Sequence, residues 1–234
     1  MDNLSIKINE SKMGNIINKI DDLIDILFEY NKDINLFKEI FYKKIEEVSY
    51  LWDKYEMLFN IRNHSKIVAI ISLYLLLNLK PDNKYYNIVI QYKKRKNLID
   101  ILELILSSAL LHDIGKTHEI KNKSSKSHSE IGYDILVKEN FIVEAISCKL
   151  HLINSALENT LPLIPFIINV ADKHVMHEKI VSIQERFLDL RERYPSYNSY
   201  FSDKAIAIYE KFVTFFYTDN LNKVIYFYNN SKLC

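Results

Sequence analysis

Six side chains of the types that bind metal ions are spread along the chain, each on an apolar helix face or near a helix end. They are His64, His112, Asp113, His128, His151 and Asp172. A buried histidine or carboxylate needs a partner, and a divalent metal ion suits both. Imidazole nitrogen and carboxylate oxygen suit Fe, Mn, Co, Ni or Zn, and no cysteine accompanies them. The set therefore predicts a centre for one or two divalent transition-metal ions rather than a structural zinc site.

The adjacent pair His112-Asp113 lies at the end of a strongly apolar helix and is followed by Lys116. Water bound to a divalent metal loses a proton near neutral pH and becomes a nucleophile. Lys116, one turn after Asp113, can hold a phosphate oxygen as a fixed positive charge. These types of residue at this spacing predict hydrolysis at phosphorus, with Asp113 and Lys116 as the catalytic residues.

A simpler interpretation applies to each histidine taken alone. A single histidine on an apolar face is usually a core or capping residue, and a lone His-Asp pair is weak support for a metal site. The ordered set of separated candidates favours the metal centre. We interpret His118 and His177 as loop or surface residues, and for His174, two residues after Asp172, both interpretations remain open.

The composition predicts an all-α protein without a membrane segment. The chain has 234 residues, only 3 glycines and 4 prolines, and a formal net charge of +1. Few turn formers and many helix formers favour helices. Cys148 and Cys234 give no disulfide framework. The N-terminus lacks a signal pattern and charges interrupt every apolar stretch, so we expect a cytoplasmic protein.

Apolar residues at helical spacing divide the chain into elements. We expect helices over residues 12–30, 33–60, 63–79, 98–113, 141–151, 180–194, 203–217 and 219–230, with one more opened by Pro162 and Pro165. Ser127 and Glu130 form a capping-box pattern, which starts a further helix at His128. Gly115 is expected to stop the 98–113 helix. Residues 85–92 fit a short strand or an irregular loop, and residues 117–127 fit a polar loop.

The candidate ligands divide the chain into three parts. Residues 1–60 carry none and are expected to form an N-terminal helical extension packed on the core. A homodimer face or a lid is the alternative for these helices. Residues 61–195 hold all six candidates, and residues 196–234 are expected to supply C-terminal helices that complete the same domain.

The order His, His-Asp, Asp, together with residues 111–116 (LHDIGK) and 170–173 (VADK), resembles the HD-domain superfamily of metal-dependent phosphohydrolases over about residues 60–195. The resemblance implies an HD-domain helical bundle over residues 61–195. It implies a first metal site that consists of His64, His112, Asp113 and Asp172. Residues 128–132 (HSEIG) and His151 are similar to the extra histidines of dinuclear members, in which Asp113 would bridge both ions.

The dinuclear subset includes diadenosine-tetraphosphate hydrolases and cyclic-dinucleotide phosphodiesterases. Residues 180–187 are similar to a bacterial branch of small HD proteins. His64 and His112 are 48 residues apart, more than is usual in the family, and residues 80–97 look like an insertion. A second histidine does not follow His151, and no Gly-Tyr-Pro signature follows, which argues against the cyclic-di-GMP branch.

Three functions are compatible with these patterns. The first is a phosphohydrolase (a phosphomonoesterase, a phosphodiesterase or a dinucleoside polyphosphate hydrolase) acting on a nucleotide or related small phosphorylated molecule. The second is a non-catalytic metal- or nucleotide-binding regulatory HD module. The third is a nuclease, because Lys93–Lys96 with Tyr85, Tyr86 and Tyr92 resembles a nucleic-acid patch. The near-zero net charge weighs against a polynucleotide partner.

Overall fold

The protein is built from helices, which confirms the all-α class. The computed structural model describes residues 20–94, 98–122, 125–157, 161–194 and 199–230. Within these ranges the only sheet is one short antiparallel hairpin, and no helix is long and apolar enough to cross a membrane. The elements are α2 (Ile20–Leu27), α3 (Ile34–Lys54), α4 (Phe59–Leu77), α5 (Tyr86–Lys94), α6 (Leu98–Leu111), α7 (Lys116–Asn122), α8 (His128–Lys138), α9 (Ile142–Leu150), α10 (Ile153–Leu157), α11 (Leu163–Asp172), β1 (Val175–Met176), β2 (Lys179–Ile180), α12 (Ile183–Arg193), α13 (Ser199–Val213) and α14 (Asp219–Asn230).

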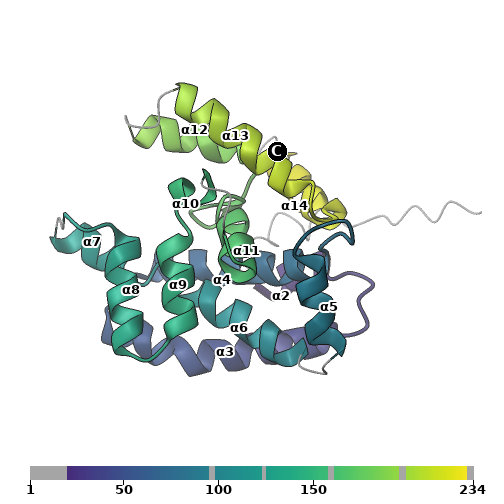
Figure 1. Ribbon diagram of the computed structural model, residues 1–234, viewed down its shortest axis with the longest axis horizontal. Helices are drawn as coiled ribbons and strands as arrows, with labels where there is room; N and C mark the ends of the chain where they lie inside the picture. Colours follow the sequence, from purple (N-terminus) through teal and green to yellow (C-terminus); the bar gives the residue numbers. More distant parts are fainter. Residues whose placement is uncertain (1–19, 95–97, 123–124, 158–160, 195–198, 231–234) are drawn as a thin grey trace, which may run out of the picture.

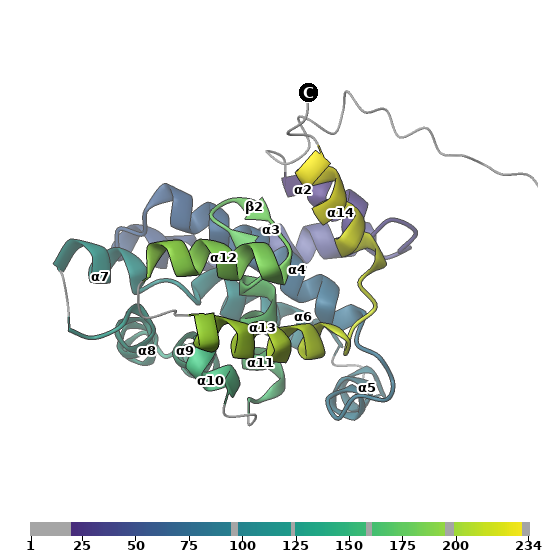
Figure 2. The ribbon, with the colours of Figure 1, turned by 90° about the horizontal axis from the view of Figure 1, so that it is seen from above.

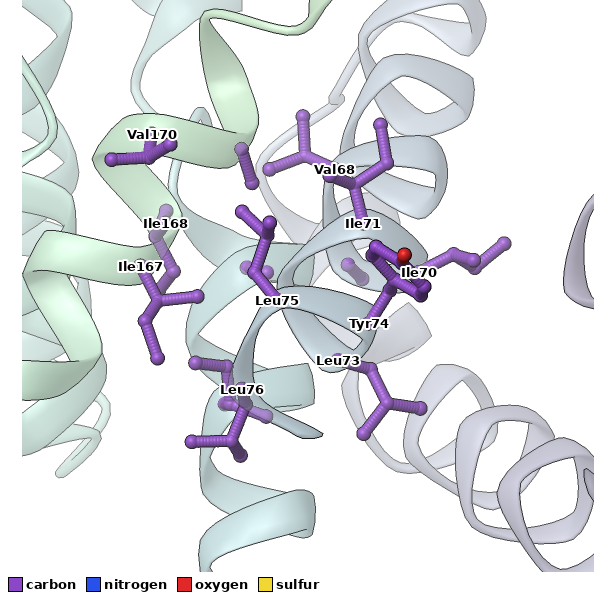
Figure 3. Close-up of a cluster of buried hydrophobic side chains, with 14 of the residues drawn as sticks. Val68, Ile70, Ile71, Leu73, Tyr74, Leu75, Leu76, Ile167, Ile168 and Val170 are labelled. Carbon is purple, nitrogen blue, oxygen red and sulfur yellow. The ribbon is translucent and has the colours of Figure 1, made fainter. Parts of the chain in front are cut away.

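Helix α4 forms the centre of the hydrophobic core. Every residue from Ile67 to Leu76 is buried, because α4 packs against α6, α11 and α2. A helix that is apolar on all faces is stable only when other elements surround it. Figure 3 shows Ile167 and Ile168 of α11 facing Leu75 of α4. This packing fixes α4, and with it the position of His64.

The other helices surround this core on three sides. Figure 1 shows α3 along the bottom, α7, α8 and α9 on the left, and α12 with α13 across the top. Figure 2 shows α14 beside α2, and these two helices are in contact. Helix α3 packs on α6, and the Nε1 atom of Trp52 donates a hydrogen bond to the carbonyl oxygen of Leu110 at 3.2 Å. This bond holds the end of α6, just before His112, against α3.

Two segments for which no helix was expected are helical. Residues 85–92 lie largely in α5, where Tyr85 and Val89, four residues apart, are both buried. The side chain of Asn83 accepts a hydrogen bond from the Tyr85 amide at 2.8 Å and so supports the start of this helix. Residues 116–122 form α7, in which Thr117 is buried. In residues 85–92 the burial of two side chains outweighs the β-propensity of the segment. In residues 116–122 the burial of Thr117 outweighs the polarity of the segment.

The predicted boundaries need two further corrections. The helix expected over 33–60 is interrupted after α3, because Glu56 has a positive φ of 50°, and α4 begins at Phe59. Helix α10 and the hairpin of β1 and β2 were not expected at all. Residues 12–19, Arg95, Lys96 and Cys234 lie outside the described residues.

Candidate metal centre

The structure brings all six candidate ligands to one place, although they come from different elements. His64 lies on α4, His112 and Asp113 form the turn after α6, His128 starts α8, His151 follows α9, and Asp172 ends α11. Two overlapping groups have ligand atoms within 4.8 Å of one another. They are His64, His112 and Asp172, and His112, Asp113 and His151. The helix ends that carry these residues therefore converge on a single centre.

One half of the centre consists of His64, His112 and Asp172. Oδ1 of Asp172 lies 3.0 Å from Nε2 of His64 and 3.7 Å from Nε2 of His112. Oδ2 of Asp113 lies 3.8 Å from the first of these nitrogens and 3.7 Å from the second. Two imidazoles and two carboxylates thus surround one point.

The other half of the centre consists of His128 and His151. Their Nε2 atoms are 3.1 Å apart, and each lies 3.5 Å from Oδ1 of Asp113. The two oxygens of Asp113 therefore face different sets of histidines. This is the geometry expected of a carboxylate that bridges two cations.

The hydrogen bonds of the histidines assign their tautomers. In each of the four rings Nδ1 has an oxygen acceptor, so Nδ1 carries the proton and the lone pair of Nε2 faces the centre. The acceptors are the carbonyl oxygen of His177 for His64 at 3.0 Å, of Ala109 for His112 at 2.7 Å and of Cys148 for His151 at 2.5 Å, and the carboxylate of Glu119 for His128 at 3.0 Å. Histidines that bind metals are commonly held in this way.

Several acceptor atoms of the centre face one another, and this arrangement tests whether a cation would fit between them. Nε2 of His64 faces a carboxylate oxygen of Asp172, and the Nε2 atoms of His128 and His151 face each other. Nε2 of His112 is buried and has no hydrogen-bond partner among the described residues. Opposed acceptors at about 3 Å repel unless a proton or a cation lies between them. A divalent cation in each half of the centre would satisfy all of them.

The carboxylates of the centre are ionised. Burial alone would raise the pKa of Asp113, but Lys116 and the surrounding histidines hold it well below its usual value. Nζ of Lys116 lies 2.7 Å from Oδ2 of Asp113. Asp172 behaves in the same way: burial alone would raise its pKa, but Lys173, with which it forms an ion pair, together with His112 and His64 holds it well below its usual value. Both carboxylates are therefore available as ligands.

The histidines differ in their tendency to hold a second proton. Burial lowers the pKa of His64, and it lowers that of His151 to about 4. Burial also opposes protonation of His112, but the facing carboxylates of Asp113 and Asp172 outweigh it and raise its pKa. Without a metal, a proton bound by His112 would partly neutralise this carboxylate pair. Metal binding would displace that proton.

Two positioning residues were missed by the sequence analysis. Glu119 accepts hydrogen bonds from the backbone amide of His128 at 2.9 Å and from its ring. The side-chain Nδ2 of Asn169 donates hydrogen bonds to the carbonyl oxygens of Leu150 at 3.1 Å and Leu152 at 3.0 Å. These two residues lie on either side of His151. A polar residue in the apolar helix α11 was a signal for Asn169. No pattern identifies Glu119, because its place depends on how α7 meets α8.

Replacing Glu119 with alanine is expected to weaken metal binding at the half of the centre that contains His128. Removing such an outer partner typically costs about 10–100-fold in metal affinity. Calorimetric titration of metal-free protein with Mn²⁺ measures it. Glu56→Gln, which removes an exposed ion pair with Lys121, is the control. Equal affinity in Glu119→Ala and the unaltered protein would show that Glu119 does not orient His128.

Gly115 has a different role from the one expected. Helix α6 ends at Leu111, and no glycine in the described ranges has a positive φ, so the prediction that Gly115 stops this helix is wrong. A Cβ atom at Gly115 would lie 2.2 Å from the carbonyl oxygen of His128 and 2.5 Å from the amide nitrogen of Gly132. The absent side chain lets the start of α8 touch the turn that carries Asp113.

The remaining candidates lie outside the centre. His118 and His177 are exposed, as expected. His174 is buried, and its Nδ1 donates to the carbonyl oxygen of Val181 at 3.1 Å, as in a core histidine. Tyr85, expected in an exposed stacking patch, is buried, and its hydroxyl donates to the carbonyl oxygen of Leu161 at 2.5 Å. It therefore cannot stack on a nucleic-acid base.

A cavity of about 490 Å³ opens over the centre. This volume is within the range of sites for small molecules. Four candidate ligands, Asp113, His128, His151 and Asp172, line it together with Lys116 and Lys173, and we call this part its floor. We call the apolar residues and two arginines that also line it its walls. The wall residues include Leu152, Ile153, Leu190 and Tyr194, and the arginines are Arg186 and Arg193.

Comparison with known proteins gives one result. Residues 61–176 match the family model of the HD domain. Curated proteins and solved structures give no match. The matched range begins two residues after the start of α4 and ends with β1, and it contains all six candidate ligands.

Proposed function

This chain belongs to the HD-domain superfamily through residues 61–176, and from this we propose that it is a metal-dependent phosphohydrolase. Its substrate would be a phosphoester or phosphoanhydride of a nucleotide or related small molecule. One observation carries the proposal: four Nε2 atoms and two ionised carboxylates converge on one centre, and four of these six residues, Asp113, His128, His151 and Asp172, line an open cavity. No candidate ligand is missing, which argues against a regulatory module that has lost its metals.

We propose that the centre holds two divalent ions. His64, His112 and Asp172 would hold one, His128 and His151 would hold the other, and Asp113 would contribute one oxygen to each. Such ions polarise a phosphoryl oxygen and lower the pKa of water. The opposed acceptors in both halves of the centre support two ions over one.

The lysines of the cavity would place the phosphate. Nζ of Lys116 lies 2.7 Å from Oδ2 of Asp113, and Lys173 contacts Asp172. Both lysines line the cavity. A phosphate that enters the centre would meet both ammonium groups. In this enclosed site their charge would stabilise the negative charge that grows on the phosphate oxygens in the transition state. Lys116 is thus proposed to bind the reacting phosphate directly.

The apolar wall supports a nucleotide rather than a bare phosphate compound. Leu152 and Ile153 face the cavity after His151, and Leu190 and Tyr194 face it from α12 and its end. Apolar and aromatic side chains beside a few polar groups are typical of sites that bind a base or another flat organic group.

Hydrolysis assays on metal-loaded protein test the proposal. We expect protein loaded with Mn, Fe, Co or Ni to hydrolyse at least one of a phosphomonoester, a dinucleoside polyphosphate and a cyclic dinucleotide. Chelation should remove the activity and re-loading should restore it. No turnover of any of the three classes by protein shown by elemental analysis to hold metal would contradict the proposal.

A further inference from the structure

The wall of the cavity formed by α12 carries two arginines that the proposed metal centre does not use. We propose that Arg186 and Arg193 form a second phosphate site beside the metal centre. The substrate would then carry a further phosphate group next to the one that is cleaved, as a condensed phosphate chain does. This inference rests on the proposed function, because it names the class of substrate for the same cavity.

Arg186 is the first observation that supports the second site. Its exposed fraction is only 8%, yet its Nε–H has no hydrogen-bond partner within the described part of the chain. A buried donor without a partner is destabilising, and more so when it is charged. Its Nη1 donates to Oδ2 of Asp189 at 2.9 Å, which leaves the rest of the guanidinium in the lining of the cavity. An anion in the cavity would satisfy the unpaired donor.

Asp189 holds the two arginines side by side. It lies three residues after Arg186 and four before Arg193, so the three side chains share one face of α12. Nε of Arg193 donates to Oδ1 of Asp189 at 2.9 Å, and its Nη2 donates to Oδ2 of the same carboxylate. Two guanidinium groups thus share one carboxylate and keep a net positive charge. Their planar forks match the oxygens of a phosphate group.

The position of Arg186 relative to the lysines completes the argument. Arg186 lines the same cavity as Lys116, Lys173 and Asp172. Arg186 is therefore close to the metal centre but is not paired with either of its carboxylates. Lys116 and Lys173 each have a carboxylate partner of their own, whereas the arginines share one. A ligand with two linked phosphate groups could reach both the lysines and the arginines.

Binding of two non-hydrolysable probes tests this inference without relying on turnover. Orthophosphate and methylenediphosphonate are titrated by calorimetry into Mn²⁺-loaded protein at a fixed free Mn²⁺ concentration. We expect the diphosphonate to bind the unaltered protein more tightly. In Arg186→Gln the affinity for the diphosphonate should fall about tenfold or more, which is the effect of losing one hydrogen bond to a charged group. The affinity for orthophosphate should change less than about twofold. Arg193→Gln should show the same selective loss to a smaller extent, because Arg193 is more exposed.

Arg191→Gln is the matched control, because Arg191 is an exposed arginine of the same helix and does not line the cavity. Arg193→Gln changes a partly exposed side chain and keeps the test decisive if Arg186→Gln does not fold. Diphosphonate binding that is unchanged in Arg193→Gln and in any folded Arg186 variant would overturn the inference and leave the proposed function standing. If neither probe binds the metal-loaded protein, both the second site and the proposed function are contradicted.

Discussion

Replacing Asp113 with asparagine is expected to lower kcat/KM by at least about 10³-fold, because losing a direct ligand should exceed the 10–100-fold effect of losing an outer partner. Asn keeps the size of the side chain but removes its charge and offers only one carbonyl oxygen. In this centre each oxygen of Asp113 faces a different set of histidines, at 3.5 to 3.8 Å. Both proposed ions would therefore be affected by one substitution.

Initial rates in excess metal, with the best substrate from the hydrolysis assays, measure this effect. Asp100→Asn is the control, because Asp100 is exposed on α6, the helix that precedes the His112-Asp113 turn. Circular dichroism should show the same helix content in both variants. If Asp113→Asn kept more than about a tenth of the activity, Asp113 would not be the residue on which the chemistry depends.

Replacing Gly115 with alanine is expected to lower the free energy of unfolding by roughly 3 kcal/mol, at the upper end of the usual cost of overpacking. The added Cβ would meet two backbone atoms, at 2.2 Å and 2.5 Å, and backbone cannot rotate out of the way. Separation of α8 from the turn would also move His128 away from Asp113. Urea unfolding of the metal-free protein measures the stability.

Gly132 offers a matched comparison. A Cβ there would lie 2.4 Å from Sγ of Cys148, which is a side-chain atom. Gly132→Ala should therefore be destabilising alone and recover stability when combined with Cys148→Ala, whereas Gly115→Ala should gain nothing from that change. This coupling is read from a double-mutant cycle. If Gly115→Ala unfolds at the same urea concentration as the unaltered protein, the contact with α8 does not position the centre.

Several features of the fold could be predicted from local patterns. Ser127 and Glu130 form the capping box that the sequence indicated, so α8 begins at His128 as expected. The apolar residues at helical spacing before His112 predicted both ends of α6 to within two residues. Both signals are local, because capping and helical periodicity involve residues at most a few positions apart. The convergence of the six candidate ligands was anticipated from the family resemblance rather than from these local signals.

Features that depend on contact between distant segments could not be predicted. Residues 85–92 are rich in Tyr, Ile and Val, which suit a strand, but the burial of Tyr85 and Val89 on the core selects a helix. The role of Gly115 follows from how closely α8 approaches, and the role of Glu119 from how α7 meets α8. Arg186 and Arg193 belong to the cavity only because α12 lies over the centre.

Metal stoichiometry tests the central claim most directly. Protein purified without oxygen and loaded with Mn²⁺ or Fe²⁺ is analysed for bound metal per chain, together with a His128→Ala, His151→Ala double variant. We expect about two ions per chain in the unaltered protein and about one in the variant, because His64, His112, Asp113 and Asp172 would remain. A ratio near one that the double variant leaves unchanged would contradict the bridging role of Asp113, and a ratio near zero would contradict the metal centre itself.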